Sequence, residues 1–288
     1  MRFIDLDLVQ EDPGGGALIT AAEQARASVA RAANEDERDI AIKSARDKWV
    51  AFRALFQELF GAKCWYTECE NPGTDDDIDH YRPKGRVAES PGHGGYWWEA
   101  FHWRNFRLSC HRANRLRVNP DSGDTHGKGD HFPLIDETVR CLVPADDLER
   151  EAPTLLDPTN PMDPPLLTFS IDGAVALAPK YAGNPTNERR IADSRIYLHL
   201  EWPLIKEGRQ AIYRQVLTRV SDGDRAEARW NAGQPAGKEA LRAVIRDLLR
   251  LTYDRAPFSR AARAFIRTFR DHGWIDSFVM PHIPQEPQ

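Results

Sequence analysis

Residues 78–87, IDHYRPKGRV, decide how this sequence is interpreted. They place an acid, Asp79, directly before a histidine, His80, and follow the pair with three cations around a Pro-Lys-Gly turn. An acid beside a histidine is common on ordinary protein surfaces. An acid, a histidine and several cations together are typical of a place where a metal ion, a base and a phosphate group meet.

The composition of the 288-residue chain is that of a globular protein, with 41% hydrophobic and 29% charged residues. No apolar run approaches the length that spans a bilayer, and the amino terminus lacks a signal-peptide pattern, so we expect a cytoplasmic protein without membrane contact. The net charge of -5 argues against a protein that coats nucleic acid. Between His80 and Asn119, however, eight Arg or Lys stand against two Glu, a local balance of +6 that suits a phosphate-contacting site.

Three regions differ in composition. Residues 1–61 are predicted to form two helices. The first covers 17–33, and the second is amphipathic and ends near Gly61. Residues 62–140 predict short strands, with 63–66 pairing with 77–80 as a hairpin, and a short helix over 112–117. Residues 141–288 predict a hairpin that turns at Asp172-Gly173, followed by three helices. These helices are expected over 187–220, 237–253 and 259–272.

Two asparagines follow the Asp79-His80 pair at informative spacing, Asn105 in WRNFRLSC and Asn114 in CHRANR. A strand–strand–helix (ββα) unit would put the pair at a strand end, Asn105 in the loop and Asn114 on the helix. These side chains would then reach one divalent cation. Phosphodiester hydrolysis needs a base, which neutral His supplies near pH 7, and a cation beside the phosphate. A carboxylate with an amide oxygen suits Mg²⁺ or Mn²⁺.

The middle of the chain resembles the HNH (His-Me finger) endonucleases, in the DH…N…N form of their motif. The resemblance rests on KCWYTE, DDDIDHYRPKGRV, GYWWEAFHWRNFRLSCHRANR and GKGDHFPLID, and extends more weakly through LLDPTNP into the C-terminal helices. The longer pattern is similar to HNH proteins of bacterial anti-phage systems, of the Septu and retron-associated kinds. It implies that His80 is the general base, that Asn105 orients the base and braces the loop, and that Asp79 and Asn114 are metal ligands.

The resemblance implies an α+β, mostly α-helical fold, with a ββα-metal core flanked by N-terminal and C-terminal helical regions. It also implies a metal-dependent endonuclease that hydrolyses DNA as the effector of a defence system. The alternative is a catalytically silent nucleic-acid-binding or scaffold subunit of an ATPase-containing complex. A third possibility is a nuclease that is inert until it docks on an ATPase partner. The sequence does not decide between DNA and RNA, nor the trigger or the oligomeric state.

Cations near the motif are predicted to hold phosphates that flank the scissile bond. These cations are Arg82, Lys84, Arg112, Arg115 and Lys128. In GKGDHFPL, Asp130 or His131 either lies beside the metal or belongs to a structural loop end anchored by Phe132, and the sequence leaves both open.

The cysteines depart from the pattern of many HNH relatives, which carry two C-x-x-C pairs that bind a structural zinc ion. Here Thr67 stands where a partner of Cys64 would be, and Ala113 where a partner of Cys110 would be. We predict that structural Zn²⁺ is absent and that the thiols are small core residues. An irregular zinc site of Cys64, Cys69 and Cys110, completed by His111 or Cys141, is the alternative.

Overall fold

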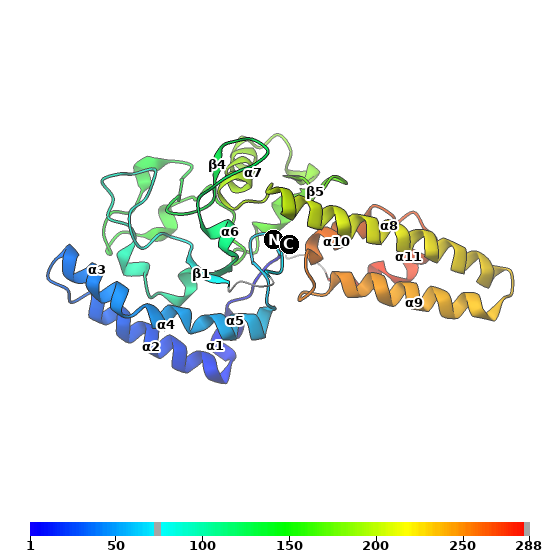
Figure 1. Cartoon of the computed structure of the whole chain (residues 1–288), viewed down its shortest axis with the longest axis horizontal. Helices are drawn as coiled ribbons and strands as arrows, with labels where there is room; N and C mark the ends of the chain where they lie inside the picture. Colours follow the sequence, from blue (N-terminus) through cyan, green and yellow to red (C-terminus); the bar gives the residue numbers. More distant parts are fainter. Residues whose placement is uncertain (72–75, 285–288) are drawn as a thin grey trace.

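The computed structural model describes residues 1–71 and 76–284. The chain is α+β and about half helical, and its described strands form three two-stranded antiparallel sheets. Figure 1 shows a body that contains the N-terminal helices and the small sheets, and an arm of two long helices that extends away from it. Among the described residues, no helix combines the length and the apolar character needed to cross a membrane.

Five helices form a layer along one side of the body (Figure 1). They are α1 (Asp7–Glu11), α2 (Pro13–Val29), α3 (Glu35–Ser44), α4 (Arg46–Val50) and α5 (Phe52–Phe60). The side chain of Asp12 caps α2 and that of Asn34 caps α3, each accepting from backbone N–H groups of the first turn. The second predicted helix is therefore three helices, which meet at Ala45 and Ala51.

The first sheet pairs β1 (Asp77–His80) with β2 (Phe106–Ser109), with Asp79 opposite Arg107 and His80 opposite Phe106. The predicted hairpin with residues 63–66 is wrong, because these residues form a turn closed by the Cys64 and Glu68 backbone rather than a strand. Only Trp65 N bonds to β2, at the Leu108 carbonyl (2.8 Å). The turn predicted between the two expected strands includes residues 72–75, which lie outside the described residues.

Helix α6 (His111–Asn114) follows β2 directly, so this segment has the order strand, strand, helix. The helix is shorter and earlier than the predicted 112–117, because Arg115 is already extended and leads into β3 (Arg117–Val118). Strand β3 pairs with β4 (Thr125–His126). Asn114 is therefore the last residue of α6.

The C-terminal half begins with the predicted hairpin, β5 (Leu167–Phe169) and β6 (Val175–Leu177), which is confirmed. The single long helix over 187–220 is wrong: α7 (Pro185–Tyr197) stops, and α8 (Pro203–Asn231) begins at a proline. Proline has no N–H to donate and restricts the residue before it, so it starts a helix better than it continues one. The last helices are α9 (Pro235–Thr252), α10 (Ser259–Arg267) and α11 (Gly273–Phe278).

Three hydrophobic clusters support the molecule. One joins the N-terminal helices to the sheet, through Phe52 and Phe56 on α5 and Phe106 and Leu108 on β2. A second joins the segment after β1 to α7, and a third fills the arm around Trp274. The N-terminal helices and the β1–β2 sheet thus share one core, and the candidate site lies where this core meets the second. The division of the chain into three regions, with boundaries after residues 61 and 140, stays a prediction.

Candidate active site

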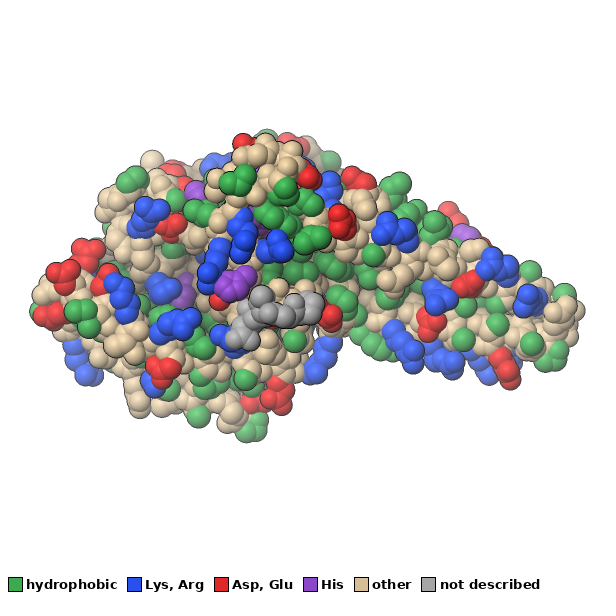
Figure 2. Space-filling view, viewed as in Figure 1, with side chains coloured by type: hydrophobic (Ala, Val, Ile, Leu, Met, Phe, Trp, Pro, Cys, Tyr) green, Lys and Arg blue, Asp and Glu red, His purple; other side chains and the backbone are tan. Residues whose placement is uncertain are grey.

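A cleft of about 230 Å³ opens at the end of β1. Its wall combines the end of the strand, the Pro-Lys-Gly turn, the end of α6 and the loop after β4. The lining residues are Ile78, Asp79, His80, Pro83, Lys84, Gly85, Arg86, Asn114, Gly129 and Asp130. Figure 2 shows Lys and Arg side chains gathered over this part of the body, around β1 and α6. The structure therefore brings Asp79, His80 and Asn114 to one cavity.

The Asp79 carboxylate is buried and bonded on both oxygens. Oδ2 accepts from the Tyr66 hydroxyl (2.6 Å), and Oδ1 accepts from Lys128 Nζ (2.9 Å). Lys128 also donates to the His80 carbonyl (2.6 Å) and is itself fully buried. Burial and the negative charge of Asp79 raise the pKa of Tyr66 well above its usual value, so the phenol remains a donor. Asp79 is thus fixed in place before any further group binds.

The His80 ring lies at the wall of the cleft, 4% exposed, between Trp49 and Phe106. Its Nε2 lies 2.9 Å from the Ala100 carbonyl oxygen, which can only accept, so Nε2 carries a proton. Burial, reinforced by the charges of Lys84 and Lys128, holds the pKa of His80 well below its usual range. The neutral ring therefore keeps its lone pair on Nδ1, which lies 3.4 Å from Lys84 Nζ.

The Asn105 side chain makes no hydrogen bond to the His80 ring among those of the described residues. Its side chain accepts from the Arg82 amide (2.8 Å) and donates to the carbonyls of Arg82 (3.0 Å) and Glu99 (3.2 Å). It thereby ties the loop after His80 to the turn that carries the Ala100 carbonyl. The two roles predicted for Asn105, to brace the loop and to orient the base, stay predictions, and the hydrogen bonds of its side chain all go to the backbone.

Asn114 faces the cleft from α6 and donates from Nδ2 to Asp77 Oδ2 (3.1 Å). This bond fixes which end of the amide is the nitrogen, and no hydrogen bond to Oδ1 occurs within the described part of the chain. The Asp79 carboxylate has lone pairs beyond the two that Tyr66 and Lys128 engage. These hard oxygen donors fit Mg²⁺ or Mn²⁺ better than a softer metal. No cluster of three or more His, Cys, Asp or Glu among the described residues could hold a metal ion.

The predicted phosphate-binding cations lie in different surroundings. Lys84 lines the cleft, and its pKa is lowered chiefly by burial. Lys128 is bonded to Asp79, and Arg112 stacks over the Trp202 ring at 5.6 Å. Arg115 is exposed and lies 3.8 Å from Asp77. Of the five, Arg115 is the most exposed and Lys84 is the one that lines the cleft, and the binding roles stay predictions.

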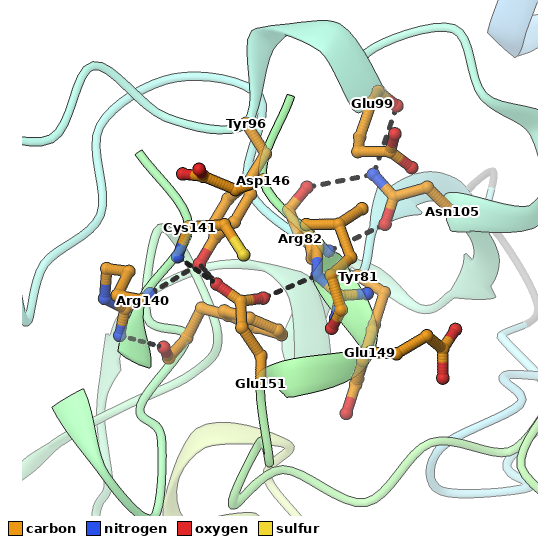
Figure 3. A network of polar contacts seen from close by, with 12 residues as sticks. Tyr81, Arg82, Tyr96, Glu99, Asn105, Arg140, Cys141, Asp146, Glu149 and Glu151 are labelled. Carbon is orange, nitrogen blue, oxygen red and sulfur yellow. Dashed lines mark hydrogen bonds and ion pairs between the residues drawn. The ribbon is translucent and has the colours of Figure 1, made fainter. Parts of the chain in front are cut away.

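Arg82 belongs to a polar network on another side of the loop (Figure 3). Its Nε donates to Glu151 Oε2 at 2.9 Å, and the other oxygen of Glu151 accepts from the Tyr96 hydroxyl at 2.7 Å. Arg140 donates in turn to the Tyr96 oxygen (2.8 Å). This network joins the loop after β1 to residues 140–151, so Arg82 has a visible structural task.

Asp130 and His131, although adjacent in the chain, lie in different surroundings. Asp130 lines the cleft and pairs with Arg86. His131 bonds through Nδ1 to Glu89 (2.7 Å) and stacks on Tyr197 with ring centroids 4.3 Å apart. Asp130 is therefore the member of the pair that is placed to influence the cavity.

Three of the four cysteines lie together beside the β1–β2 sheet. The thiol of Cys110 contacts those of Cys64 and Cys69, and Thr67 Oγ1 donates to Cys69 Sγ (3.1 Å). The pKa of Cys110 is raised to about 12: contact with the Cys64 thiol opposes this rise, while contact with Cys69 and burial favour it. Burial raises the pKa of Cys64 well above its usual value. The thiols of Cys64 and Cys110 therefore stay protonated near neutral pH. The prediction that structural zinc is absent stays a prediction.

Sequence reasoning missed Tyr66 and Asp77 as site residues. Asp77 lies two positions before Asp79 on the same strand, so the alternation of β side chains signals that both face the same way. No spacing rule identifies Tyr66, which reaches Asp79 only because the turn at 64–69 packs against β2.

These features describe an α+β protein with an acid–histidine pair at a strand end and oxygen donors on one cleft. No protein-family model matches the chain, and no solved structure matches it. The chain is similar to Septu protein PtuB of Bacillus mycoides (strain KBAB4), with 30% identity over 109 residues. This match covers 36% of the present chain and 33% of that protein, so the chain spans about a third of the length of the relative. It supports a relation to the Septu type of protein.

Proposed function

We propose that this chain is a metal-dependent HNH endonuclease that hydrolyses phosphodiester bonds of DNA, as part of an anti-phage defence system. The observation that carries the proposal is the cleft that Asp79, His80 and Asn114 share, together with the state of the His80 ring. The partial likeness to a Septu protein supports the defence role and the presence of further subunits. An ATPase among these subunits is part of the proposal.

His80 acts as the general base in this proposal. Its proton on Nε2 is committed to the Ala100 carbonyl, so Nδ1 takes the proton from the attacking water. The lowered pKa keeps Nδ1 unprotonated at neutral pH, and the rings of Trp49 and Phe106 hold the imidazole in one orientation. Asn105 is a positioning residue for His80. It holds the loop at Arg82 and the turn at Glu99, which lie on either side of the His80 ring.

Asp79 and Asn114 would hold a Mg²⁺ or Mn²⁺ ion, which when bound neutralises charge on the scissile phosphate and the departing oxygen. Tyr66 and Lys128 keep the Asp79 carboxylate in position. Lys84 lies beside Nδ1 and supplies positive charge on the phosphate side of the cleft. None of these contacts reads a base, so cleavage is expected to depend little on sequence.

The test is a nicking time course on supercoiled plasmid with Mg²⁺ or Mn²⁺, and with EDTA. His80→Ala should slow cleavage about 10²–10⁴-fold, the usual loss for a positioned base. His93→Ala is the matched control, since His93 is also 4% exposed and bonded to a carbonyl oxygen, that of Cys141 (2.7 Å), but does not line the cleft. Circular dichroism checks the fold of both variants. Equal rates in both would remove His80 from the chemistry.

A catalytically silent DNA-binding or scaffold subunit is the second candidate. The ion pair of Lys128 with Asp79 favours it, because an ammonium group already neutralises the carboxylate. This candidate predicts DNA binding without cleavage under either metal, and it is excluded if EDTA-sensitive nicking disappears with His80→Ala.

A further inference from the structure

The arm formed by α8 and α9 carries a row of cations along one face. Lys238, Arg242, Arg246 and Arg250, called the basic ridge below, follow each other at intervals of four residues on α9. All four are exposed. Figure 2 shows Lys and Arg side chains along the edge of the arm where α9 lies. Residues four apart are neighbours on a helix surface, and each lies about 40° further round the helix than the one before, so the ridge is a continuous row that winds about a third of a turn around α9.

The ridge is unfavourable for the helix that carries it. Each like-charge pair at this spacing destabilises a helix by about 0.2–0.5 kcal/mol, and the ridge contains three such pairs in succession. Arg242 and Arg246 make no hydrogen bond or ion pair with any residue that the structure describes, and Lys238 lies over the Trp230 ring at 5.7 Å. The nearby carboxylate of Asp247 is engaged by Arg219 and Arg250 instead. The fold therefore leaves the two central cations of the ridge, Arg242 and Arg246, without a paired carboxylate among the described residues, whereas Arg250 is paired with Asp247.

The charge of the arm opposes that of the whole chain. Helices α8 and α9 contain ten Arg or Lys against six Asp or Glu, a balance of +4, while the chain as a whole carries -5. The ridge ends at Arg250, which also lines a groove of about 530 Å³ between the two helices. Arg214 and Arg219 of α8 line the same groove. The positive surface thus continues from the ridge across to α8.

We propose that the basic ridge binds the phosphate backbone of double-stranded DNA. The inference rests on the proposed function, for which it names the substrate class and a second contact beside the cleft. Twelve residues of α-helix span about 18 Å. One strand of a duplex presents a phosphate every ~3.4 Å along the axis, so the ridge is as long as about five phosphates. Contacts of this kind position a duplex without selecting its sequence.

The experiment measures binding of a 24-base-pair (about two-turn) fluorescent duplex by anisotropy, in EDTA, over a range of NaCl concentrations. The variant Lys238→Gln/Arg242→Gln/Arg246→Gln should bind about a hundredfold more weakly at 0.1 M salt. The slope of log K against log [NaCl] should fall by about 2–3, since each lost phosphate contact removes about 0.9. The control variant removes three exposed cations of the body, Arg31→Gln/Lys43→Gln/Lys180→Gln, and should change both quantities much less.

Binding in EDTA does not depend on cleavage, so this result and that of the nicking assay are separate. Weaker binding with a smaller slope supports the ridge even if the chain does not cleave DNA. An affinity and slope equal to those of the parent would overturn the proposal, even if the chain is a nuclease, and would assign the ridge to an acidic protein surface. Equal losses in the ridge and control variants would also overturn it, because net charge alone would then explain binding. Melting temperatures of all variants confirm that each is folded.

Discussion

The cations of the cleft and those of the basic ridge look alike in the sequence, but the fold uses them differently. In the cleft, Lys128 is buried in an ion pair with Asp79, and Arg86 pairs with Asp130. On the ridge, Arg242 and Arg246 are exposed and adjoin only like charges among their neighbours four residues away. A cation buried against a carboxylate maintains local structure, whereas one that the fold leaves uncompensated is available to another molecule. Burial and pairing, more than charge, separate the two tasks.

The largest effect should follow from breaking the buried pair. Lys128→Met leaves the Asp79 carboxylate inside the body without its cation, and such a loss typically costs about 3–5 kcal/mol. Arg246→Met makes the same chemical change on the ridge and should alter the free energy of unfolding by less than about 0.5 kcal/mol. Urea unfolding followed by tryptophan fluorescence compares the two. Similar costs would show that the division between cleft and ridge is not real.

A buried histidine near the start of the arm tests, through pH, whether a charge buried without a partner destabilises this fold. His199 is fully buried, and its ring lies beside the backbone of Arg115 and His126 without a hydrogen bond of ordinary geometry among the described residues. Burial, with the nearby His126 and Arg117, lowers its pKa to about 4. The unfolded chain, with a pKa near 6.5, binds this proton first, so stability should fall as pH drops from about 6.5 to about 4 and this contribution then levels off.

The shift corresponds to about 3 kcal/mol at most. His199→Asn should remove this component, because Asn does not titrate and tolerates the positive φ of 51° found there. The free energy of unfolding of parent and variant is compared at pH 7 and pH 4.5. The parent should lose more stability than the variant between the two. An equal loss would mean that other groups account for the acid sensitivity.

The two proposed metal ligands should differ in effect, since one carries a charge and the other only a dipole. Asp79→Asn keeps the shape of the side chain and should weaken the apparent affinity for Mg²⁺ or Mn²⁺ about 100-fold, and Asn114→Ala about 10-fold. Cleavage rate and metal-induced melting shift are titrated for each protein. If Asp79→Asn matches the parent, the cation lies elsewhere, and Asp130, which also lines the cleft, becomes the first candidate.

Elements with strong local signals could be predicted from the sequence, and those that depend on tertiary packing could not. Asp172-Gly173 indicated the turn between β5 and β6, and Asn34 with the acidic residues after it is a similar local signal at the start of α3. The strand predicted to pair with β1 was wrong, because the actual partner, β2, follows β1 after 25 residues, and no local sequence pattern indicates a pairing at that distance. Likewise, a single helix was predicted over 187–220 because the helical pattern of apolar residues continues across the break between α7 and α8. Pro203, the first residue of α8, was the sequence signal for a new helix start.

The candidate site shows the same limit. Motif order led to Asp79, His80 and Asn114, and the structure places all three on one cleft. The motif could not show that Lys128 binds Asp79, 49 residues away, or that Arg82 binds Glu151, 69 residues away. Both contacts depend on how distant segments of the chain pack. A run of cations in sequence says where positive charge is present. Which of these charges are neutralised depends on how distant segments pack.

The smallest expected effect is on the ridge itself. Arg246→Glu replaces its two like-charge pairs, with Arg242 and Arg250, by two opposite-charge pairs. Each pair changes from about 0.2–0.5 kcal/mol of repulsion to a similar attraction, so the variant should stabilise α9 by about 1 kcal/mol. Arg225→Glu makes the same change on α8, where Arg225 pairs with Asp222, and should destabilise instead. Hydrogen exchange of the α9 and α8 amides measures both effects locally. They should shrink in 1 M NaCl, where the screening length is about 3 Å. If Arg246→Glu slows no exchange in α9 at low salt, the ridge carries no repulsion, and the charge conflict that sets it apart from the cleft does not exist.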